Sequence, residues 1–404
     1  MDKQRVALLI CPFDPFGPIH GGVIDVKSRI EMLIEQGFSI KIVAYTKSLE
    51  ATKGSITVKS ANVEIWRIPR SKLRWLLLPW QAFSSCTRFT LMGRQAVEFI
   101  IRVYEPTILI IEGSQMSKWI PFIQSRLSNI TVLTRMHNIE SSFFLEMARA
   151  SNSFISWFAN LVTAMAIRSD DYRAIKKSDG LLFISDSELH ISQSNYPELR
   201  SKMHWVPVLV ETLDNKLNAY ENERDRPLVV FTGTMSMNSN IDAVVWFANQ
   251  VWPLIISSFS EAKFLIIGRD PTKEVRELVN DALSIEVTGA VEDIGLYISR
   301  ATLNVVPLRH GAGVKIKIVQ ALSQGLPTVS TSVGINGIGI SPDSGIVLVA
   351  DTANEFAEQC CNVLRSSDLR RSLSHKSKSF YDSRYSKDAV CSAFFLALNT
   401  AYEK

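Results

Sequence analysis

The stretch from Pro307 to Thr331, PLRHGAGVKIKIVQALSQGLPTVST, decides the fold of the chain. Its glycine loop at residues 311–313 precedes a run with the apolar spacing of a helix, and Gly325 followed by Pro327 ends that run. Apolar segments that read as strands lie on both sides of it, at residues 301–306 and 328–330. The pattern predicts a strand, a glycine loop, a helix and a second strand, a unit typical of α/β folds.

A loop of this kind places backbone N–H groups at the positive end of a helix dipole, which favours phosphate. Lys315 and Lys317 stand in the first turn of the predicted helix, where a cation is otherwise unfavourable. An anionic ligand would reverse that penalty. The alternative interpretation is a solvated lysine pair on an ordinary crossover helix, because glycine loops before helices are common.

The length and composition are those of an ordinary globular protein. The 404 residues suffice for two or three domains, and 46% are hydrophobic and 21% charged. A net charge of +4 is too small to indicate a nucleic-acid partner. The five cysteines lack CxxC spacing and suit a reducing cytoplasm. No segment reaches the roughly 20 apolar residues of a membrane span, and the apolar start is too short for a signal peptide.

The N-terminal half opens with another strand–turn–helix pattern. Residues 5–11 read as a buried strand, and a helix is predicted from residue 23 to residue 35 after the pair Gly21-Gly22. The glycine pair either lets the backbone approach a ligand or makes a tight turn, with Asp25 favouring the start of the helix. No G-x-G-x-x-G follows the first strand, which argues against a dinucleotide cofactor.

Polar side chains follow the strand predicted at residues 131–136, where Arg135, His137 and Glu140 occur together. Ligand sites of open α/β sheets lie at the carboxyl ends of their strands. A lone histidine is nevertheless more often a structural hydrogen-bonding group. The aromatic-rich residues 143–177 are interpreted as a pair of core helices.

These motifs together resemble the retaining GT-B glycosyltransferases of the family-4 type, also called glycosyl transferases group 1. The opening stretch is similar to the family pattern G-A-G-x-R-x-K-I-x-E-A-L-A-x-G-x-P-V-V-x-T, with Gln320 in place of the glutamate. A glutamine keeps an acceptor oxygen for the nucleotide ribose but loses the charge-assisted bond. Other segments match R-x-H-N-x-E at 135–140, G-x-M at 233–235 and G-x-V-x-D at 289–293. Residues 21–26, G-G-x-x-D-V, resemble the family's G-G-x-x-x-D-V segment with one residue fewer.

The resemblance implies an α/β, GT-B fold with two Rossmann-like domains facing across a cleft. The expected acceptor-side domain spans residues 1–210, and a polar linker spans 211–227. The nucleotide-sugar-binding domain is expected at 228–385. A final helix within 386–404 would cross back to the first domain.

The resemblance also implies roles for individual residues. His137 would face the donor sugar, and Lys315 and Lys317 would stabilise the diphosphate as negative charge develops on it. The expected donor-binding residues are Gly21, Gly22, Gly233, Met235, Arg269, Val291, Asp293, Gly311, Ala312, Gly313 and Gln320. The expected acceptor-binding residues are Asp25, Arg135 and Glu140, the last of which would alternatively support His137.

The implied reaction is transfer of a sugar from a nucleotide diphosphate sugar to a hydroxyl of a lipid-linked or polysaccharide glycan, with retention of configuration. No cofactor or metal is expected, because the chain has no Asp-x-Asp and no His/Cys cluster with metal spacing. Two alternatives are a GT-B binding protein that has lost turnover and a nucleotide-sugar epimerase. Peripheral contact with the inner membrane face is predicted through a basic and aromatic patch, with a core helix as the alternative. The patch comprises Arg70, Lys72, Arg74, Trp75 and Trp80.

Overall fold

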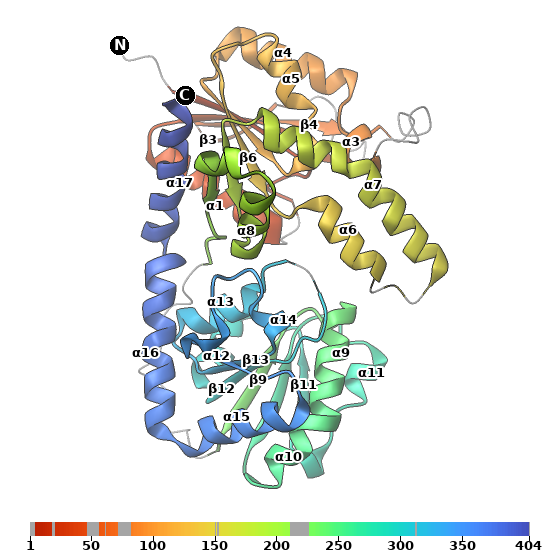
Figure 1. Ribbon diagram of the computed structural model, residues 1–404, viewed down its shortest axis with the longest axis vertical. Coiled ribbons are helices and arrows are strands. Elements are labelled where there is room, and N and C mark those ends of the chain that lie inside the picture. The colour runs from red at the N-terminus through yellow and green to blue at the C-terminus, as the bar shows by residue number, and fades with distance from the viewer. Residues whose placement is uncertain are drawn as a thin grey trace. The chain divides into compact units, whose positions relative to one another are not determined.

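The computed structural model describes residues 5–17, 21–46, 56–60, 62–71, 82–149, 151, 153–210, 226–311 and 313–403. The chain forms two compact units, each of which contains a sheet flanked by helices (Figure 1). The first unit combines Met1–Leu209 with Val390–Lys404, and the second unit spans Val210–Ala389.

The sheet of the first unit has the strand order β3-β4-β2-β1-β5-β6-β7-β8 within the described residues. All neighbouring strands are parallel except β3, which pairs antiparallel with β4 at one edge and was not predicted. The strands are β1 Val6–Cys11, β2 Ser39–Thr46, β3 Ile56–Ser60, β4 Val63–Pro69, β5 Ile108–Glu112, β6 Thr131–Met136, β7 Gly180–Phe183 and β8 Met203–Trp205.

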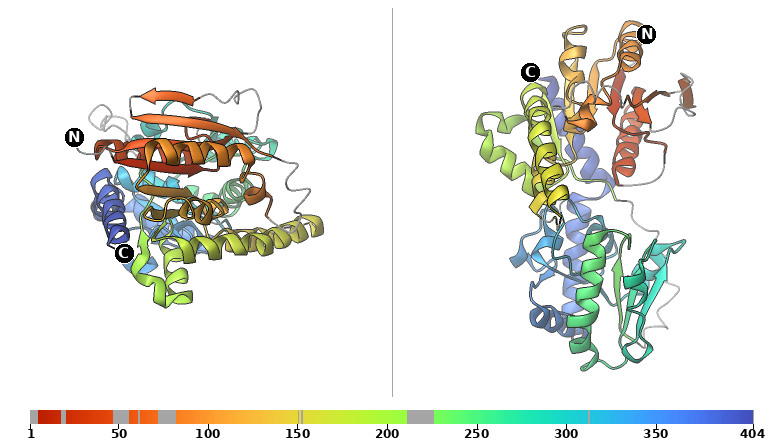
Figure 2. Two further views of the ribbon diagram at one scale, coloured as in Figure 1. Left: turned by 90° about the horizontal axis from the view of Figure 1, so that it is seen from above. Right: turned by 90° about the vertical axis from the view of Figure 1, so that its right-hand side faces the viewer.

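Helices cover both faces of this sheet, as a parallel sheet requires (Figure 2). The α-helices are α1 Gly21–Glu35, α3 Phe83–Cys86, α4 Leu91–Tyr104, α5 Trp119–Gln124, α6 Glu140–Arg149, α7 Phe154–Lys177, α8 Asp186–Asn195 and α17 Lys387–Tyr402. Short 3-10 segments lie at Ser114–Met116 and Pro197–Lys202. The last helix, α17, belongs to the core of the first unit, because Val390, Phe394 and Leu398 pack with residues of β1 and α1.

The sheet of the second unit is parallel throughout, with the order β11-β10-β9-β12-β13-β14. Its strands are β9 Leu228–Thr232, β10 Lys263–Ile267, β11 Ile285–Gly289, β12 Leu303–Val306, β13 Thr328–Ser330 and β14 Leu348–Val349. Its α-helices are α9 Asn238–Trp246, α10 Trp252–Ile256, α11 Lys273–Arg276, α12 Ile294–Arg300, α13 Ile316–Ser323, α14 Ser332–Ile335, α15 Ala353–Arg365 and α16 Ser367–Arg384. A π-helical segment, Phe247–Val251, joins α9 to α10, and 3-10 segments lie at Asp281–Leu283 and Pro342–Ser344.

The strand–loop–helix–strand prediction for the opening stretch is confirmed as β12, α13 and β13. Val319 and Leu322 are buried as predicted, whereas Ile316 is only half-buried. Gly325 ends the helix in the left-handed region at φ 62°, and its N–H donates to the Leu322 carbonyl. A side chain there would also meet Ser374, whose Oγ lies 2.8 Å from the position of a Cβ.

Two local predictions were wrong. Residues 143–177 lie in two helices, α6 and α7, but their aromatic residues are not all core, because Phe154 is 75% and Phe158 is 54% exposed. Aromatic side chains favour burial, but the composition of a helix does not say whether its own unit or another molecule covers them. The second concerns α9: Ser239 with Asp242 three residues later has the spacing of a weak capping box and predicts a helix capped near Ser239, but α9 begins after Met237, which makes no side-chain capping bond.

Candidate functional site

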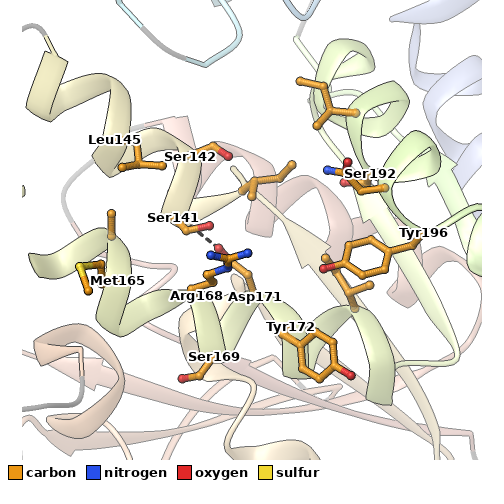
Figure 3. Close-up of a pocket in the computed structure, with 15 residues that line it drawn as sticks. Ser141, Ser142, Leu145, Met165, Arg168, Ser169, Asp171, Tyr172, Ser192 and Tyr196 are labelled. Atoms are coloured by element: carbon orange, nitrogen blue, oxygen red, sulfur yellow. Dashed lines mark hydrogen bonds between the residues drawn. The ribbon is translucent and has the colours of Figure 1, made fainter. Parts of the chain in front are cut away.

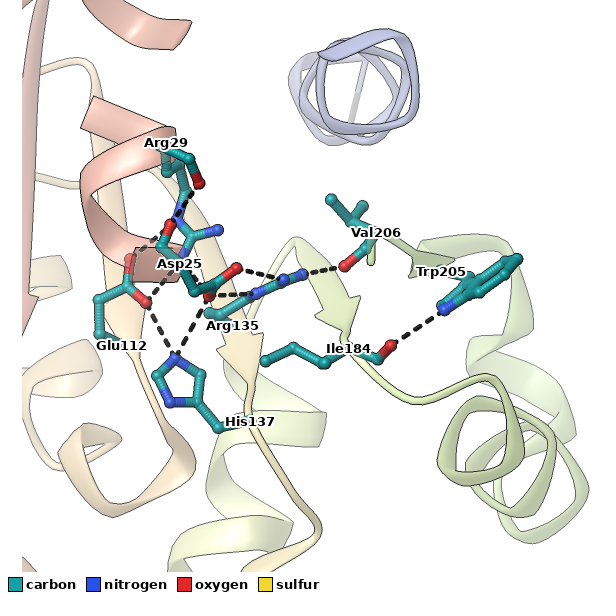
Figure 4. A network of polar contacts seen from close by, with 9 residues as sticks. Asp25, Arg29, Glu112, Arg135, His137, Ile184, Trp205 and Val206 are labelled. Atoms are coloured by element: carbon teal, nitrogen blue, oxygen red, sulfur yellow. Dashed lines mark hydrogen bonds and ion pairs between the residues drawn. The ribbon is translucent and has the colours of Figure 1, made fainter. Parts of the chain in front are cut away.

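The carboxyl ends of β5 and β6 meet the first turns of α1 at a buried polar network (Figure 4). Arg29 Nε and Nη2 donate to the two carboxylate oxygens of Glu112, both over 2.9 Å, and Nη2 also donates to Asp25 over 2.8 Å. Arg135 donates to the other carboxylate through Nε and Nη2, at 2.9 and 2.7 Å from the oxygens of Asp25. Arg135 also donates to the Val206 carbonyl. All four charged side chains are buried.

The charges in this network balance, with two carboxylates against two guanidinium groups. Burial by itself would raise the pKa of Asp25, but the attraction of Arg135 and Arg29 outweighs it and holds that pKa below its usual range. Burial likewise opposes ionisation of Glu112, and Arg29 together with His137 lowers its pKa despite that burial. Both carboxylates are therefore ionised at neutral pH.

His137 stands at the edge of the network, with 16% of its side chain exposed. Its Nε2 atom lies 3.2 Å from a Glu112 oxygen and 3.8 Å from an Asp25 oxygen. Because an ionised carboxylate only accepts hydrogen bonds, Nε2 carries the proton and donates it to Glu112. In the neutral imidazole this leaves Nδ1 as the acceptor, so the network fixes the orientation and the tautomer of the ring.

Asp25, Glu112 and His137 also place their ligand atoms within 4.8 Å of one another, which is close enough for one metal ion. The chemistry of these donors does not fit a cation. Both carboxylates already bind buried guanidinium groups, and a divalent ion would add charge to a network that is already neutral.

A second group of carboxylates lies beside His137 in the same unit. Burial first, and then the charge of Asp171, raises the pKa of Glu140 to about 7, while His137 acts in the opposite direction. Burial also raises the pKa of Glu188 to about 7, although its Oε1 accepts a 2.8 Å bond from the Ile139 N–H. Asp171 accepts from Ser114 Oγ over 2.5 Å and from the Ser141 N–H over 2.8 Å. Glu140 can therefore exchange a proton near neutral pH.

The polar centre of the second unit is Lys317, in the first turn of α13. Its Nζ lies 2.7 Å from Asn240 Oδ1 and 4.0 Å from the centre of the Phe231 ring. Burial, and secondly the charge of Lys315, lowers the pKa of Lys317 to about 7. No carboxylate among the described residues pairs with it.

Gly233 makes room for this lysine. A Cβ at Gly233 would lie 2.8 Å from Asn240 Nδ2 and 3.0 Å from Lys317 Nζ. Asn240 is itself held by a 2.9 Å bond from Nδ2 to the Thr234 carbonyl. The turn after β9 and the start of α13 therefore meet directly at the lysine ammonium.

The glycine loop before α13 is shaped by its own backbone and by Lys315. Gly311 and Gly313 have φ values of 122° and 77°. Lys315 Nζ donates to the carbonyls of both glycines, over 2.8 and 2.5 Å. Nearby, Arg309 Nε donates to Asp242 of α9 over 2.9 Å. Lys315 therefore stabilises the glycine loop through hydrogen bonds to its carbonyls, whereas the Nζ atom of Lys317 donates to Asn240.

The other predicted donor-site residues have varied surroundings. Met235 is buried, and its N–H donates to the Arg269 carbonyl over 2.8 Å. The side chain of Arg269 is exposed. Val291 packs against a buried apolar cluster, and Asp293 caps α12 by accepting from the Gly295 N–H over 2.8 Å. The Gln320 side chain is half-buried and forms no hydrogen bond with the described part of the chain.

The remaining predicted residues lie in the first turn of α1, near Pro12, or outside the described residues. Gly21 and Gly22 form the first turn of α1, and the Arg70 guanidinium donates to the Pro12 carbonyl over 2.9 Å. Ala312, Lys72, Arg74, Trp75 and Trp80, and the predicted linker up to residue 225, lie outside the described residues. The roles given to all these residues stay predictions.

No role is predicted for Arg29 or Glu112 from the sequence, and Asn240 matches the family pattern around Gly233 and Met235 without being placed beside Lys317. Arg29 follows Asp25 by four residues, the spacing at which side chains on one helix face meet, so a signal was present. Glu112 is the last residue of β5, at the same strand end as His137. Nothing in the sequence indicates that Asn240 would reach Lys317, which lies 77 residues later.

The sequence of the second unit is similar to a known protein family, and nearly the whole chain is similar to one bacterial protein. Residues 226–366 match the family described as glycosyl transferases group 1. An "Uncharacterized 44.6 kDa protein in cps region" from Klebsiella pneumoniae is 23% identical, over 94% of this chain and 96% of its own length.

Solved structures share the fold at low sequence identity. Sucrose-phosphate synthase from Thermosynechococcus elongatus superimposes with a TM-score of 0.66, at 16% identity over 99% of each chain. WaaG, described as a glycosyltransferase involved in lipopolysaccharide biosynthesis, gives a TM-score of 0.63 at 13% identity, over 96% of this chain and 98% of its own. HepE from Anabaena, solved in complex with UDP, gives 0.61 at 12% identity, over 98% and 100%.

The fold is thus the GT-B fold of two Rossmann-like units, and the predicted resemblance to glycosyltransferases is confirmed. The glycosyl transferases group 1 match lies within the second unit, where it covers β9, Lys317 and the glycine loop. Among the described residues, no helix combines the length and the apolar character of a membrane span.

Proposed function

We propose that the protein transfers a sugar from a nucleotide diphosphate sugar to a hydroxyl of a glycan acceptor, with retention of configuration. The second unit would bind the donor, and the first unit would contribute His137 and the acceptor side. The family match supports glycosyl transfer in general, and the UDP bound to HepE supports a nucleoside diphosphate as the handle of the donor.

One observation carries the proposal, which is the ammonium of Lys317. It is held by a neutral amide and an aromatic ring, and no carboxylate of the described residues balances its charge. Lys317 is half-buried, and a cation withdrawn from water without a counter-charge is unfavourable, so a phosphate placed at the start of α13 would supply that charge. The same contact would stabilise the leaving nucleoside diphosphate as the sugar departs.

The first unit supports the sugar side of this reaction. Because Glu112 fixes the Nε2 proton of His137, the Nδ1 atom is free to accept a hydrogen bond from a donor-sugar hydroxyl. Glu140, whose pKa lies near 7, is suited to bind the acceptor hydroxyl and to take up its proton. Asp25 and Arg135 are buried in their own ion pair, so we infer that they position His137 and do not touch the acceptor.

We also propose that transfer needs no metal. Lys317 supplies positive charge where a divalent ion would otherwise neutralise the diphosphate. The Asp25–Glu112–His137 group is already neutralised by Arg29 and Arg135. Assays with and without EDTA test this directly, and we expect the same turnover in both.

A panel of nucleotide sugars, incubated with glycan and lipid-linked acceptors, tests the main proposal. We expect one donor to release its nucleoside diphosphate only when an acceptor is present, and we expect NMR of the product to show the anomeric configuration of the donor. Nucleotide binding without transfer to any acceptor would indicate a binding protein. A free sugar or an epimer formed without acceptor would indicate an epimerase.

A further inference from the structure

The N-terminal half of α7 carries an apolar surface that the described remainder of its unit leaves exposed. Phe154 is 75%, Ile155 is 80% and Met165 is 70% exposed. Contiguous apolar surface of this kind is unusual on a folded unit and indicates a binding surface. The α7 surface, as we call it, comprises Phe154, Ile155, Trp157, Phe158, Val162 and Met165.

The spacing of these residues makes the surface continuous. Phe154, Phe158, Val162 and Met165 follow one another at intervals of four, four and three residues, so they share one face of the helix. The ring of Phe154 stacks on those of Trp157 and Phe158, with centroids 5.6 and 6.4 Å apart. Figures 1 and 2 show this part of α7 extending away from the sheet of its unit, next to α6.

The exposure is not confined to that face. Every residue from 153 to 159 is exposed, so the first turns of α7 are uncovered on all sides. A folded protein partner would cover one side of such a helix. A lipid interface surrounds an inserted segment and would cover all of it.

The charge pattern favours the same occupant. From Met147 to Ser169 the only charged residues are Arg149 and Arg168, and the nearest acidic residue before them is the exposed Glu146 of α6. The acids that follow do not oppose an anionic surface, because Asp170 is buried and paired with Arg173, and Asp171 is buried and hydrogen-bonded to Ser114 and Ser141. Apolar residues flanked by arginines are typical of segments that bind anionic lipid headgroups.

A cavity of about 860 Å³ adjoins the surface, between α6, α7 and α8. Figure 3 shows Leu145 and Met165 at its border and Arg168 among its lining residues. Arg168 therefore stands where apolar residues give way to polar ones, which is the depth at which an arginine meets lipid phosphates.

We propose that the tip of the α6–α7 hairpin inserts the α7 surface into the interface of an anionic lipid bilayer. The anchoring does not depend on glycosyl transfer and is measured without donor or acceptor. It also differs in place from the membrane contact predicted at Arg70–Trp80, which lies elsewhere in the sequence.

The test is flotation of the full-length protein with vesicles of phosphatidylethanolamine and phosphatidylglycerol. We expect the triple substitution Phe154→Ser, Ile155→Ser and Phe158→Ser to weaken vesicle binding about a thousandfold, since each of the three inserted apolar side chains contributes roughly tenfold. All three side chains are exposed, so the unfolding temperature should not fall. Arg149→Gln with Arg168→Gln should weaken binding to these vesicles and leave binding to pure phosphatidylcholine vesicles unchanged.

The matched control substitutes exposed apolar residues elsewhere in the same unit, as Leu91→Ser with Leu396→Ser. If that control lowers binding as much as the triple variant, or if the wild type does not bind vesicles, the proposal is wrong. A wild-type dimer in solution that the triple variant converts to a monomer, without vesicle binding, would show that a second copy of the chain occupies the surface.

A local readout excludes an indirect effect. Trp157 lies within the α7 surface, so brominated lipids should quench part of the tryptophan fluorescence of the wild type. Trp157→Phe should remove most of that quenching while leaving vesicle binding nearly intact. Quenching that is unchanged in Trp157→Phe would place the membrane contact elsewhere and overturn the proposal.

Discussion

The two units carry polar centres of opposite design. In the first unit, Asp25 and Glu112 are paired with Arg29 and Arg135, so that every charge of this network has a partner. In the second unit, the described residues provide Lys317 with the Asn240 amide and the Phe231 ring but with no carboxylate. A network whose charges are balanced holds its members in place. A cation that lacks a counter-charge favours the arrival of an anion, so the first centre positions a side chain and the second receives a ligand.

The largest expected effect comes from breaking the balanced network with Glu112→Gln. This change leaves Arg29 with half of its compensating charge in a buried position, so the free energy of unfolding should fall by about 3–5 kcal/mol. Denaturant titration measures it. Glu98→Gln, which removes a carboxylate from the exposed pair with Arg126, is the control and should cost less than about 1 kcal/mol. Equal losses in the two variants would mean that the network is not charge-critical.

Removing the charge of Lys317 should not lower the free energy of unfolding, in contrast to removing the charge of Glu112. Lys317→Met keeps most of the length of the side chain and removes a half-buried cation that has no counter-charge among the described residues, so the free energy of unfolding should stay the same or rise. Affinity for the nucleotide sugar should fall by about 2–4 kcal/mol, because the diphosphate loses its buried partner. Calorimetric titration measures the affinity, and Lys273→Met, on the exposed side of α11, should leave it unchanged. Unchanged affinity in Lys317→Met would remove this lysine from the donor site.

The pH dependence of donor binding tests whether Lys317 is the group that receives the diphosphate. The pKa of Lys317 is lowered to about 7 in the free protein, and a bound diphosphate would raise it. Above pH 7 binding must therefore take up a proton, and affinity should decrease by up to about tenfold per pH unit. Calorimetry in buffers of different ionisation enthalpy detects that proton at pH 8. Uptake that persists in Lys317→Met would assign the proton to another group.

The smallest expected effect is that of Gln320→Glu. A carboxylate would restore a charge-assisted hydrogen bond to the ribose, so affinity for the donor should stay equal or improve by about 1 kcal/mol. The half-buried side chain of Gln320 forms no hydrogen bond with the described part of the chain that the change would break. Loss of donor binding would contradict the ribose assignment.

Much of this comparison was predictable from the sequence, and the unpredicted part has a physical reason. The run around Lys317 predicted β12, the glycine loop, α13 and β13, because local spacing and the glycine stop determine them. His137 and Arg135 could be placed at a strand end for the same reason. The partners that define the two centres could not, since Glu112 reaches Arg29 across 83 positions and Asn240 reaches Lys317 across 77.

The exposed aromatic residues of α7 are a second feature that the sequence could not predict. Phenylalanine is typical of a protein core, yet Phe154 and Phe158 are exposed. A hydrophobic pattern alone does not distinguish a helix that packs on its own unit from one that binds another molecule. The difference lies along α7 itself: its second half is buried at Ile167 and Ala174, whereas its first turns are exposed.

The closing helix α17 has a consequence for how the molecule is made. The core around β1 and α1 includes Val390, Phe394, Ala397, Leu398 and Ala401, so the unit that leaves the ribosome first is completed last. At ordinary elongation rates its open apolar face waits on the order of ten seconds or more while the second unit is synthesised. During that interval the nascent chain presents the groove that α17 will fill, and a chaperone that shields this groove would act at the most aggregation-prone moment in the life of the protein.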